Sequence, residues 1–437
     1  MNPSDSQGSG SAAQSPRRRV LVTIHFHRAI SNGLSRDATI RGNVIGADLF
    51  LKDARIVLPD RIVDRGGVVL VDGRIDRIFD TSAHRAQGPH TLELHGATLF
   101  PGFIDLHIHG AVGVDTMEAS TEGLQQVSEF LTSQGVTGWL PTLVPASLDQ
   151  YTRSIDTIAE RMRSQHDDTS PGARALGVHY EGPFVNSKQC GALHREHFRT
   201  FQSAADLDCL AVLPDREAVH LMTLAPEIEG GVELVQELDR RGWIVSLGHT
   251  RAQTEVLDQA AKAGARHMTH FMNAMAPLHH RSPGPVGWGL MRDDVTCDMI
   301  ADGLHLDRET LRLLQKLKTP ARLLLISDAI CAAGLGDGDY QIWGETISVA
   351  EGRTSNSSGT IAGSVITMLD AVRMMLSLGA SEVEVARMAA TNPARLVRIE
   401  KECGSIAAGK RADLVALDHE LKVKLTIIGG QVAYSDN

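Results

Sequence analysis

The sequence has few cysteines: it holds five in 437 residues, and no two of them form a Cys-x-x-Cys pair. An odd and dispersed set argues against a disulfide framework and against a thiolate zinc site, and it predicts a reducing compartment. Long apolar runs are also absent, since no stretch approaches the ~18–20 residues of a membrane helix. The run Val20–Ile24 is too short for the core of a signal peptide. We therefore expect a soluble, cytoplasmic protein without a membrane partner.

An excess of positive charge is missing too. Lys and Arg number 43 against 53 Asp and Glu, which gives a net charge of −10 and argues against a nucleic-acid partner. Apolar residues make up 42% and charged residues 22%, which is ordinary globular usage and excludes disorder over most of the chain. The length suits two to four domains, of which an α/β barrel would take ~250 residues.

The two ends of the ordered part have β character. Residues 46–100 contain strand-like runs joined at Asp72-Gly73, a strong hairpin signal, and residues 404–437 repeat the pattern around Gly429-Gly430. We expect both ends to build one small β-sandwich, with residues 101–403 inserted between them as a second domain. Residues 1–45 are rich in Ser and Gly at their start, and we expect them to be a disordered or unassigned extension.

The central segment alternates short apolar runs with amphipathic helical stretches. Such alternation over this length predicts a (β/α)8 barrel of the TIM type. Periodicity alone does not exclude a doubly wound open sheet, although no Gly-rich nucleotide loop follows the first strand. The expected strands are Phe103–Ile108, Thr137–Leu143, Ala175–Tyr180, Val219–Leu224, Trp243–Leu247, His267–Phe271, Val295–Ile300 and Leu323–Ser327.

Six of these strands end in residues that bind metals or carry protons. In a barrel the carboxyl ends of all strands converge on one mouth, so these side chains should lie together. Alternate residues of a strand share a face, and His107 and His109 can therefore present both rings to one ion. The residues are His107 and His109, Glu181, His249, His270, His305, and Asp328.

A single histidine at a strand end is more often a hydrogen-bonded surface residue than a ligand, and the chain has 19 histidines. Six strand ends that each carry the right residue type are a much less probable coincidence. Histidine together with carboxylate suits a divalent ion such as zinc, although iron, cobalt and manganese fit as well.

Here the motifs resemble a known family. The run Pro101-Gly102-Phe103-Ile104-Asp105-Leu106-His107-Ile108-His109, followed by Glu181, His249, His270 and Asp328, resembles the amidohydrolase superfamily. Glu181-Gly182-Pro183, Asn273-Ala274-Met275 and Asp302-Gly303-Leu304-His305 are similar to its N-acetylglucosamine-6-phosphate deacetylase branch over about residues 48–434. The resemblance implies a metal-dependent hydrolase that releases acetate and D-glucosamine 6-phosphate, in amino-sugar catabolism and cell-wall recycling.

The resemblance also implies roles for individual residues. Glu181, His249 and His270 would hold the principal metal ion, and His107 and His109 would complete a second position, so that one or two ions bind. Asp328 would be the catalytic acid and base. The implied substrate contacts are Ala192, His194, Asn273, Ala274, Arg281, His305, Ile361, Ala362 and Gly363. Arg281 would reach the neighbouring site of a homodimer and help to hold the sugar phosphate.

One loop departs from the family pattern. Relatives tend to have a histidine two residues after the glycine that corresponds to Gly191, whereas this sequence reads Gly191-Ala192-Leu193-His194. Either His194 takes the role of polarising the carbonyl, or that contact is missing. Three other functions stay open: a deacetylase of N-acetylgalactosamine 6-phosphate, a hydrolase or deaminase of cyclic amides or nucleobases, and a non-catalytic scaffold.

Overall fold

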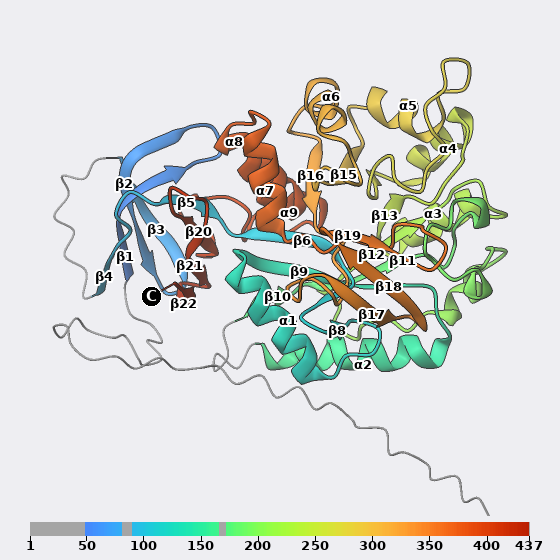
Figure 1. The fold of residues 1–437 in the computed structure, drawn as a ribbon, viewed down its shortest axis with the longest axis horizontal. Coiled ribbons are helices and arrows are strands. Elements are labelled where there is room, and N and C mark those ends of the chain that lie inside the picture. The colour runs from blue at the N-terminus through green and yellow to red at the C-terminus, as the bar shows by residue number, and fades with distance from the viewer. Residues whose placement is uncertain (1–48, 81–89, 166–171, 437) are drawn as a thin grey trace, which may run out of the picture. The chain divides into compact units, whose positions relative to one another are not determined.

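The computed structural model describes residues 49–80, 90–165 and 172–436. The expected N-terminal extension at residues 1–45 lies outside these ranges. Within the described part, two large sheets, the helices around the second of them and two small antiparallel sheets form the protein (Figure 1).

The first sheet is built from both ends of the described chain. Its strands run in the order β22-β21-β20-β5-β1-β2-β3, and β4 pairs with β1. The expected hairpin forms at Asp72-Gly73, where both residues adopt the left-handed conformation with φ of 48° and 73°. The pairing gives one continuous sheet, so the expected β-sandwich is not confirmed. The strands are β1 (Leu49–Val57), β2 (Ile62–Val71), β3 (Arg74–Phe79), β4 (His90–Glu93), β5 (Thr98–Pro101), β20 (Leu414–Leu417), β21 (Val423–Ile428) and β22 (Gln431–Ser435).

The second sheet is a parallel barrel of eight strands, with the short β10 (Arg174–Ala175) paired to β9 beside it. The first and last strands meet where the Asp328 amide donates to the His107 carbonyl (2.9 Å) and the His109 amide donates to the Ala329 carbonyl (2.8 Å). This closure excludes the open, doubly wound sheet. The eight strands are β6 (Phe103–Ile108), β9 (Val136–Leu143), β11 (Gly177–Glu181), β12 (Val219–Leu224), β13 (Ile244–Leu247), β14 (His267–Met268), β15 (Thr296–Ile300) and β16 (Leu323–Ile326).

Helices between the strands cover the barrel. In α6, for example, one apolar face is buried, since Leu311 and Leu314 are buried while Leu313 and Leu317 stay exposed. Ser120 caps α1 by accepting a hydrogen bond from the Gly123 amide (3.1 Å). The helices are α1 (Thr121–Ser133), α2 (Leu148–Ser164), α3 (Gly231–Arg240), α4 (Thr254–Ala263), α5 (Gly284–Met291), α6 (Arg308–Lys318), α7 (Met368–Ser377), α8 (Glu382–Ala386) and α9 (Asn392–Leu396).

Two antiparallel additions accompany the barrel. A short pair, β7 (Gly110–Ala111) and β8 (Val114–Asp115), follows the first barrel strand. A three-stranded sheet follows the last one and consists of β17 (Gly338–Ile342), β18 (Glu345–Ala350) and β19 (Arg353–Ser355). Its first two strands form a hairpin that turns at Trp343-Gly344.

Candidate metal centre and active-site cavity

The polar residues that were predicted at the strand ends lie together at one end of the barrel. Glu181 is the last residue of β11, and His249, His270 and Asp328 each follow a barrel strand by two residues. His107 lies in β6 and His109 one residue beyond it. All six side chains are buried, and no more than 7% of any of these residues is exposed. The barrel thus gathers six residues that the sequence placed at five separate strand ends.

Glu181 lies between two pairs of histidines. Its Oε1 atom is 2.8 Å from His249 Nε2 and 3.0 Å from His270 Nε2. Its Oε2 atom is 3.3 Å from His109 Nε2 and 3.7 Å from His107 Nε2. The carboxylate can therefore contribute one oxygen to each of two sites, and either group of three residues could hold a metal ion.

Asp328 lies on the side of the second pair. Its Oδ1 atom is 3.2 Å from His107 Nε2 and 3.3 Å from His109 Nε2. The Asp328 backbone is held from both sides, because its amide donates to the His107 carbonyl and its carbonyl accepts from the Ser364 amide (2.7 Å). The carboxylate is thus fixed beside the histidines without belonging to either group of three.

The electrostatics of the cluster favour bound positive charge. Burial alone would lower the pKa of His109, but hydrogen bonds to Asp328 and Glu181 outweigh it and raise that pKa to about 10. Burial would raise the pKa of Glu181, yet the histidines around it hold that pKa well below its usual value. The pKa of Asp328 is also lowered, since His107 and His109 outweigh the effect of its burial.

The donor set fits a divalent metal ion. The Nδ1 atom of His249 donates to the carbonyl of Gln189 (2.8 Å), because that oxygen can only accept, and the neutral ring therefore directs the lone pair of Nε2 into the cluster. This Nε2 is only 3.1 Å from His270 Nε2. The two ring nitrogens thus lie within hydrogen-bond distance and could equally face one shared ion, and imidazole with carboxylate is a ligand set that zinc prefers.

Three residues of the cluster have strained backbones. The φ angles of His249, His270 and Asp328 are 47°, 32° and 51°, in the left-handed region that few non-glycine residues occupy. Such outliers cost about 1–3 kcal/mol each and cluster at functional sites. Eleven other non-glycine residues of the described chain also have positive φ, so the strain supports a functional role only together with the cluster itself.

A cavity of about 290 Å³ opens onto the cluster. Among the predicted substrate contacts, Ala192, Asn273, Ala274, His305, Ile361 and Gly363 line it. Ala362 does not line it but is buried between two residues that do. The other lining residues are Glu181, Gly191, Leu193, His249, His270, Ile300, Asp328, Trp343 and Thr360.

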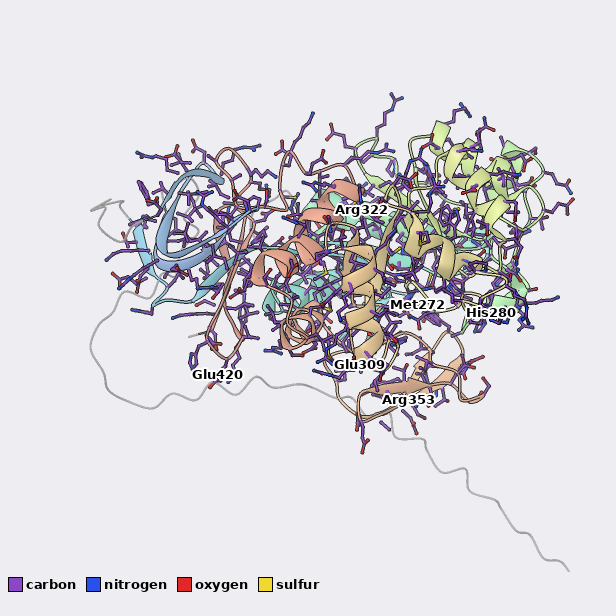
Figure 2. The ribbon with its side chains drawn as sticks, turned by 90° about the horizontal axis from the view of Figure 1, so that it is seen from above. Met272, His280, Glu309, Arg322, Arg353 and Glu420 are labelled. Atoms are coloured by element: carbon purple, nitrogen blue, oxygen red, sulfur yellow. The ribbon has the colours of Figure 1, made fainter. Side chains whose placement is uncertain are left out.

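Two predicted contacts lie away from this cavity. His194 lines a neighbouring cavity instead, and its Nε2 is 3.9 Å from Glu345 Oε1. Arg281 is exposed, and one of its guanidinium nitrogens is 2.9 Å from the Nε2 of His280, which is labelled in Figure 2. In the single chain described here, neither side chain lines the active-site cavity.

Sequence reasoning gave no role to two residues of this region. Asp302 accepts hydrogen bonds from the amides of Leu304 and His305, and its Oδ2 is 2.6 Å from His305 Nδ1. Burial would raise the pKa of Asp302, but the bond from His305 outweighs it and lowers that pKa. The spacing Asp302-x-x-His305 was the available signal. Trp343 also lines the cavity, and a single tryptophan between two turns carries no sequence signal of that kind.

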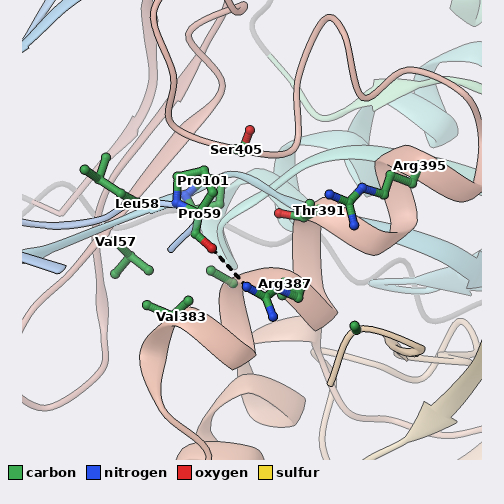
Figure 3. Close-up of a pocket in the computed structure, with 11 residues that line it drawn as sticks. Val57, Leu58, Pro59, Pro101, Val383, Arg387, Thr391, Arg395 and Ser405 are labelled. Carbon is green, nitrogen blue, oxygen red and sulfur yellow. Dashed lines mark hydrogen bonds between the residues drawn. The ribbon is translucent and has the colours of Figure 1, made fainter. Parts of the chain in front are cut away.

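A second crevice, of about 150 Å³, lies away from the cluster between the first sheet and helices α8 and α9 (Figure 3). Arg387 donates to the carbonyl of Pro59 across it (3.0 Å). None of the predicted site residues lines this crevice.

Comparison with known proteins identifies the family of the chain. Residues 98–433 match the model of the Amidohydrolase family. The chain is similar to N-acetylglucosamine-6-phosphate deacetylase of Bacillus subtilis (strain 168), at 36% identity over 393 residues that cover 88% of this chain and 97% of that protein. It is also similar to N-acetylgalactosamine-6-phosphate deacetylase of Escherichia coli O157:H7, at 37% identity over 336 residues that cover 77% and 87%.

Solved structures agree with the fold. The crystal structure of N-acetylglucosamine-6-phosphate deacetylase from Thermotoga maritima superposes with a TM-score of 0.79 at 33% identity, and the match covers 89% of this chain and 100% of that one. A variant of the deacetylase from Mycobacterium smegmatis in complex with N-acetyl-D-glucosamine-6-phosphate gives a TM-score of 0.80 at 29% identity, with the same coverage.

Proposed function

Because the chain belongs to the amidohydrolase family, we propose that it hydrolyses N-acetyl-D-glucosamine 6-phosphate to D-glucosamine 6-phosphate and acetate. The observation that carries this proposal is the buried cluster of four histidines, Glu181 and Asp328, of which Glu181, His249, His270 and Asp328 line the cavity. A non-catalytic scaffold has no need for such a cluster, since burying six ionisable side chains costs folding stability.

The distances support two metal positions. Glu181, His249 and His270 would hold the principal ion, and His107 and His109 would hold a second one together with the other oxygen of Glu181. Zinc suits the ligands best, although iron, cobalt and manganese remain compatible. A bound divalent ion would polarise the amide carbonyl and lower the pKa of a water molecule.

Asp328 would move the proton. Its lowered pKa keeps the carboxylate ionised at neutral pH, as a general base requires. It would accept a proton from the attacking water while the oxygen of that water bonds to the carbonyl carbon. It would then deliver the proton to the amide nitrogen, because the carbon–nitrogen bond breaks only when the nitrogen leaves as a neutral amine. The short contacts to His107 and His109 hold the carboxylate oxygen in place for both transfers.

The remaining lining residues would bind the sugar phosphate. Asn273, the backbone at Ala192 and Ala274, and the loop at residues 361–363 would contact the substrate, and His305 would donate to the phosphate. Asp302 orients this imidazole through Nδ1, which leaves Nε2 free for the ligand. In a homodimer, Arg281 of one subunit would pair with the phosphate bound in the site of the other subunit. The exposed position of Arg281 supports this role. His194 lines the neighbouring cavity, which favours the interpretation that no histidine of this loop polarises the scissile carbonyl.

The nearest alternative differs only at the sugar. A relative that is 37% identical is named N-acetylgalactosamine-6-phosphate deacetylase, so the epimer at C4 is a second candidate substrate. No helix in the described part of the chain is long and apolar enough to cross a membrane. A cytoplasmic location in amino-sugar catabolism and cell-wall recycling is part of the proposal, and the dispersed cysteines support it.

One experiment tests the proposal directly. Purified protein is given N-acetylglucosamine, N-acetylgalactosamine and their 6-phosphates, and acetate release is measured with and without a chelator. We expect fast, chelator-sensitive release from N-acetylglucosamine 6-phosphate and slow release from the unphosphorylated sugars. Faster release from the galactosamine epimer would select the alternative. Absence of release from every sugar, by metal-loaded protein, would refute the proposal.

A further inference from the structure

The hairpin that follows the last barrel strand has an unusual turn. Ile342 pairs with Glu345, so Trp343 and Gly344 form a two-residue loop. Their φ angles are 51° and 80°, which is the left-handed conformation that Asn and Gly normally supply at these positions. A large aromatic side chain is strained there. A turn of this kind persists only where the surrounding structure holds it, and such strain points to function.

The indole of Trp343 lies beside the reacting groups. Its ring centroid is 5.1 Å from that of His109, and the two rings meet edge to face at 78°. His109 is in turn 3.3 Å from the carboxylate of Asp328. The indole therefore lies beside His109, which contacts the proposed proton-transfer group, and the scissile carbonyl would bind next to that group.

Trp343 also separates two cavities. The neighbouring cavity that His194 lines, from here on the second cavity, has a volume of about 220 Å³ and adjoins the active-site cavity. The residues common to both linings are Ala192, Leu193 and Trp343. Neither Asn273 nor His305 lines this second cavity. The dividing wall thus lies away from Asn273 and His305, and the alkyl chain of a longer acyl group would extend from the carbonyl carbon towards it.

The second cavity could accept an aliphatic chain. Part of its lining is apolar and comes from Met117, Val144, Pro145 and Ala146. Its other parts are lined by five polar residues, Glu118, Gln150, His194, Glu196 and His197, so the apolar contact is confined to one side. An acyl chain that passed the wall would find both apolar contact and space.

We propose that Trp343 sets the length of the acyl group, because its indole closes the active-site cavity at the methyl group of the acetyl substrate. This inference rests on the proposed function. Trp343 acts here as a specificity-determining residue and takes no part in proton transfer. An acyl chain longer by one methylene meets the indole, whereas a smaller side chain at position 343 joins the two cavities.

The test compares N-acetyl-, N-propionyl- and N-butyrylglucosamine 6-phosphate, with release of the free amine as a common readout. One methylene in a hydrophobic pocket changes kcat/KM by about 10–200-fold. We expect the wild type to lose at least about tenfold for each added methylene. Trp343→Ala should raise the ratio of butyryl to acetyl turnover by about 100-fold or more, since two methylenes are involved.

The matched control is Gln341→Ala. Gln341 lies in the same hairpin and is exposed, its side chain donates to Thr346 Oγ1 (2.7 Å), and it lines neither cavity. We expect it to keep the wild-type ratio. Leu193→Ala shortens the same wall from a different loop, and it should raise the ratio in the same direction even if Trp343→Ala does not fold.

The outcomes separate the two claims. A wild type that cleaves none of the three substrates refutes the proposed function. A wild type that cleaves the acetyl substrate and uses the butyryl substrate equally well overturns the role of Trp343. The role is also overturned if folded Trp343→Ala keeps the wild-type ratio or, where that variant is unfolded, if Leu193→Ala keeps it.

Discussion

Asp328→Asn is the most direct perturbation of the proposed chemistry. The substitution keeps the size and shape of the side chain and removes its ability to carry a proton at neutral pH. The backbone should tolerate the change, because asparagine is one of the residues that adopt the left-handed conformation most readily and φ at this position is 51°. The two backbone hydrogen bonds of Asp328, to the His107 carbonyl and from the Ser364 amide, do not involve the side chain.

The expected loss can be worked out from the role of the carboxylate. A positioned general acid or base contributes about 10²–10⁴ in rate. At about 1.4 kcal/mol for each factor of ten, this is roughly 3–5 kcal/mol of barrier. Metal content should stay near that of the wild type, since Asp328 belongs to neither of the two groups of three ligands. We therefore expect a folded, metal-loaded protein whose kcat falls by at least about 100-fold.

Acetate release, elemental analysis and thermal unfolding are measured on the same preparation. Asp258→Asn serves as the control, because Asp258 lies on α4, where it accepts from Trp288 Nε1 (2.8 Å) and Arg292 (2.9 Å) and does not line the cavity. Its kcat should equal that of the wild type. The assignment of Asp328 would be refuted by a metal-loaded Asp328→Asn variant with near-wild-type kcat.

Three further predictions concern metal binding and substrate affinity, and one concerns stability. Glu181→Gln should lower the occupancy of both metal positions, whereas His107→Ala should lower only one; elemental analysis that gave the reverse would contradict the bridging role. Arg281→Ala should raise KM sharply for the 6-phosphorylated sugar and little for its unphosphorylated analogue, and equal effects would exclude a phosphate contact. Asp302→Asn should raise KM for the same substrate with a smaller effect on kcat, because it loosens the phosphate-binding imidazole rather than the proton-transfer group. Asp413→Asn should lower the free energy of unfolding by about 3–5 kcal/mol, measured by denaturant titration, because the Asp413 carboxylate is 2% exposed and pairs with both Arg174 and Arg411 (3.0 Å each); a loss below about 1 kcal/mol would contradict this.

Much of the barrel could be predicted because its strands are short, apolar and bounded by turn residues. β6 and β12 begin and end where the apolar runs predict. β14 is shorter than expected: it ends at Met268, because the chain turns at His270, where φ is 32°. A local conformation that tertiary contacts impose leaves no pattern in the sequence.

The gathering of the six cluster residues could be predicted for a different reason. Residue type together with position at a strand end was enough, because parallel strands in a barrel must all direct their carboxyl ends to one mouth. The contribution of loops could not be predicted in this way. His194 and Trp343 lie on segments without periodicity, and only their tertiary contacts determine which cavity each of them lines.

Hydrogen bonds from neighbouring segments hold the strained backbones of His249, His270 and Asp328 in place. Each of the three conformations costs about 1–3 kcal/mol, against a total stability of about 5–15 kcal/mol for an ordinary protein. Hydrogen bonds from neighbouring segments offset this cost: the amide of His270 donates to the carboxylate of Asp298, and the carbonyl of His249 accepts from the Asn186 amide (3.1 Å). The surroundings therefore hold ligands and proton carrier where unstrained strand geometry would not place them. Substitutions that relax one of these residues should stabilise the fold at the expense of the reaction.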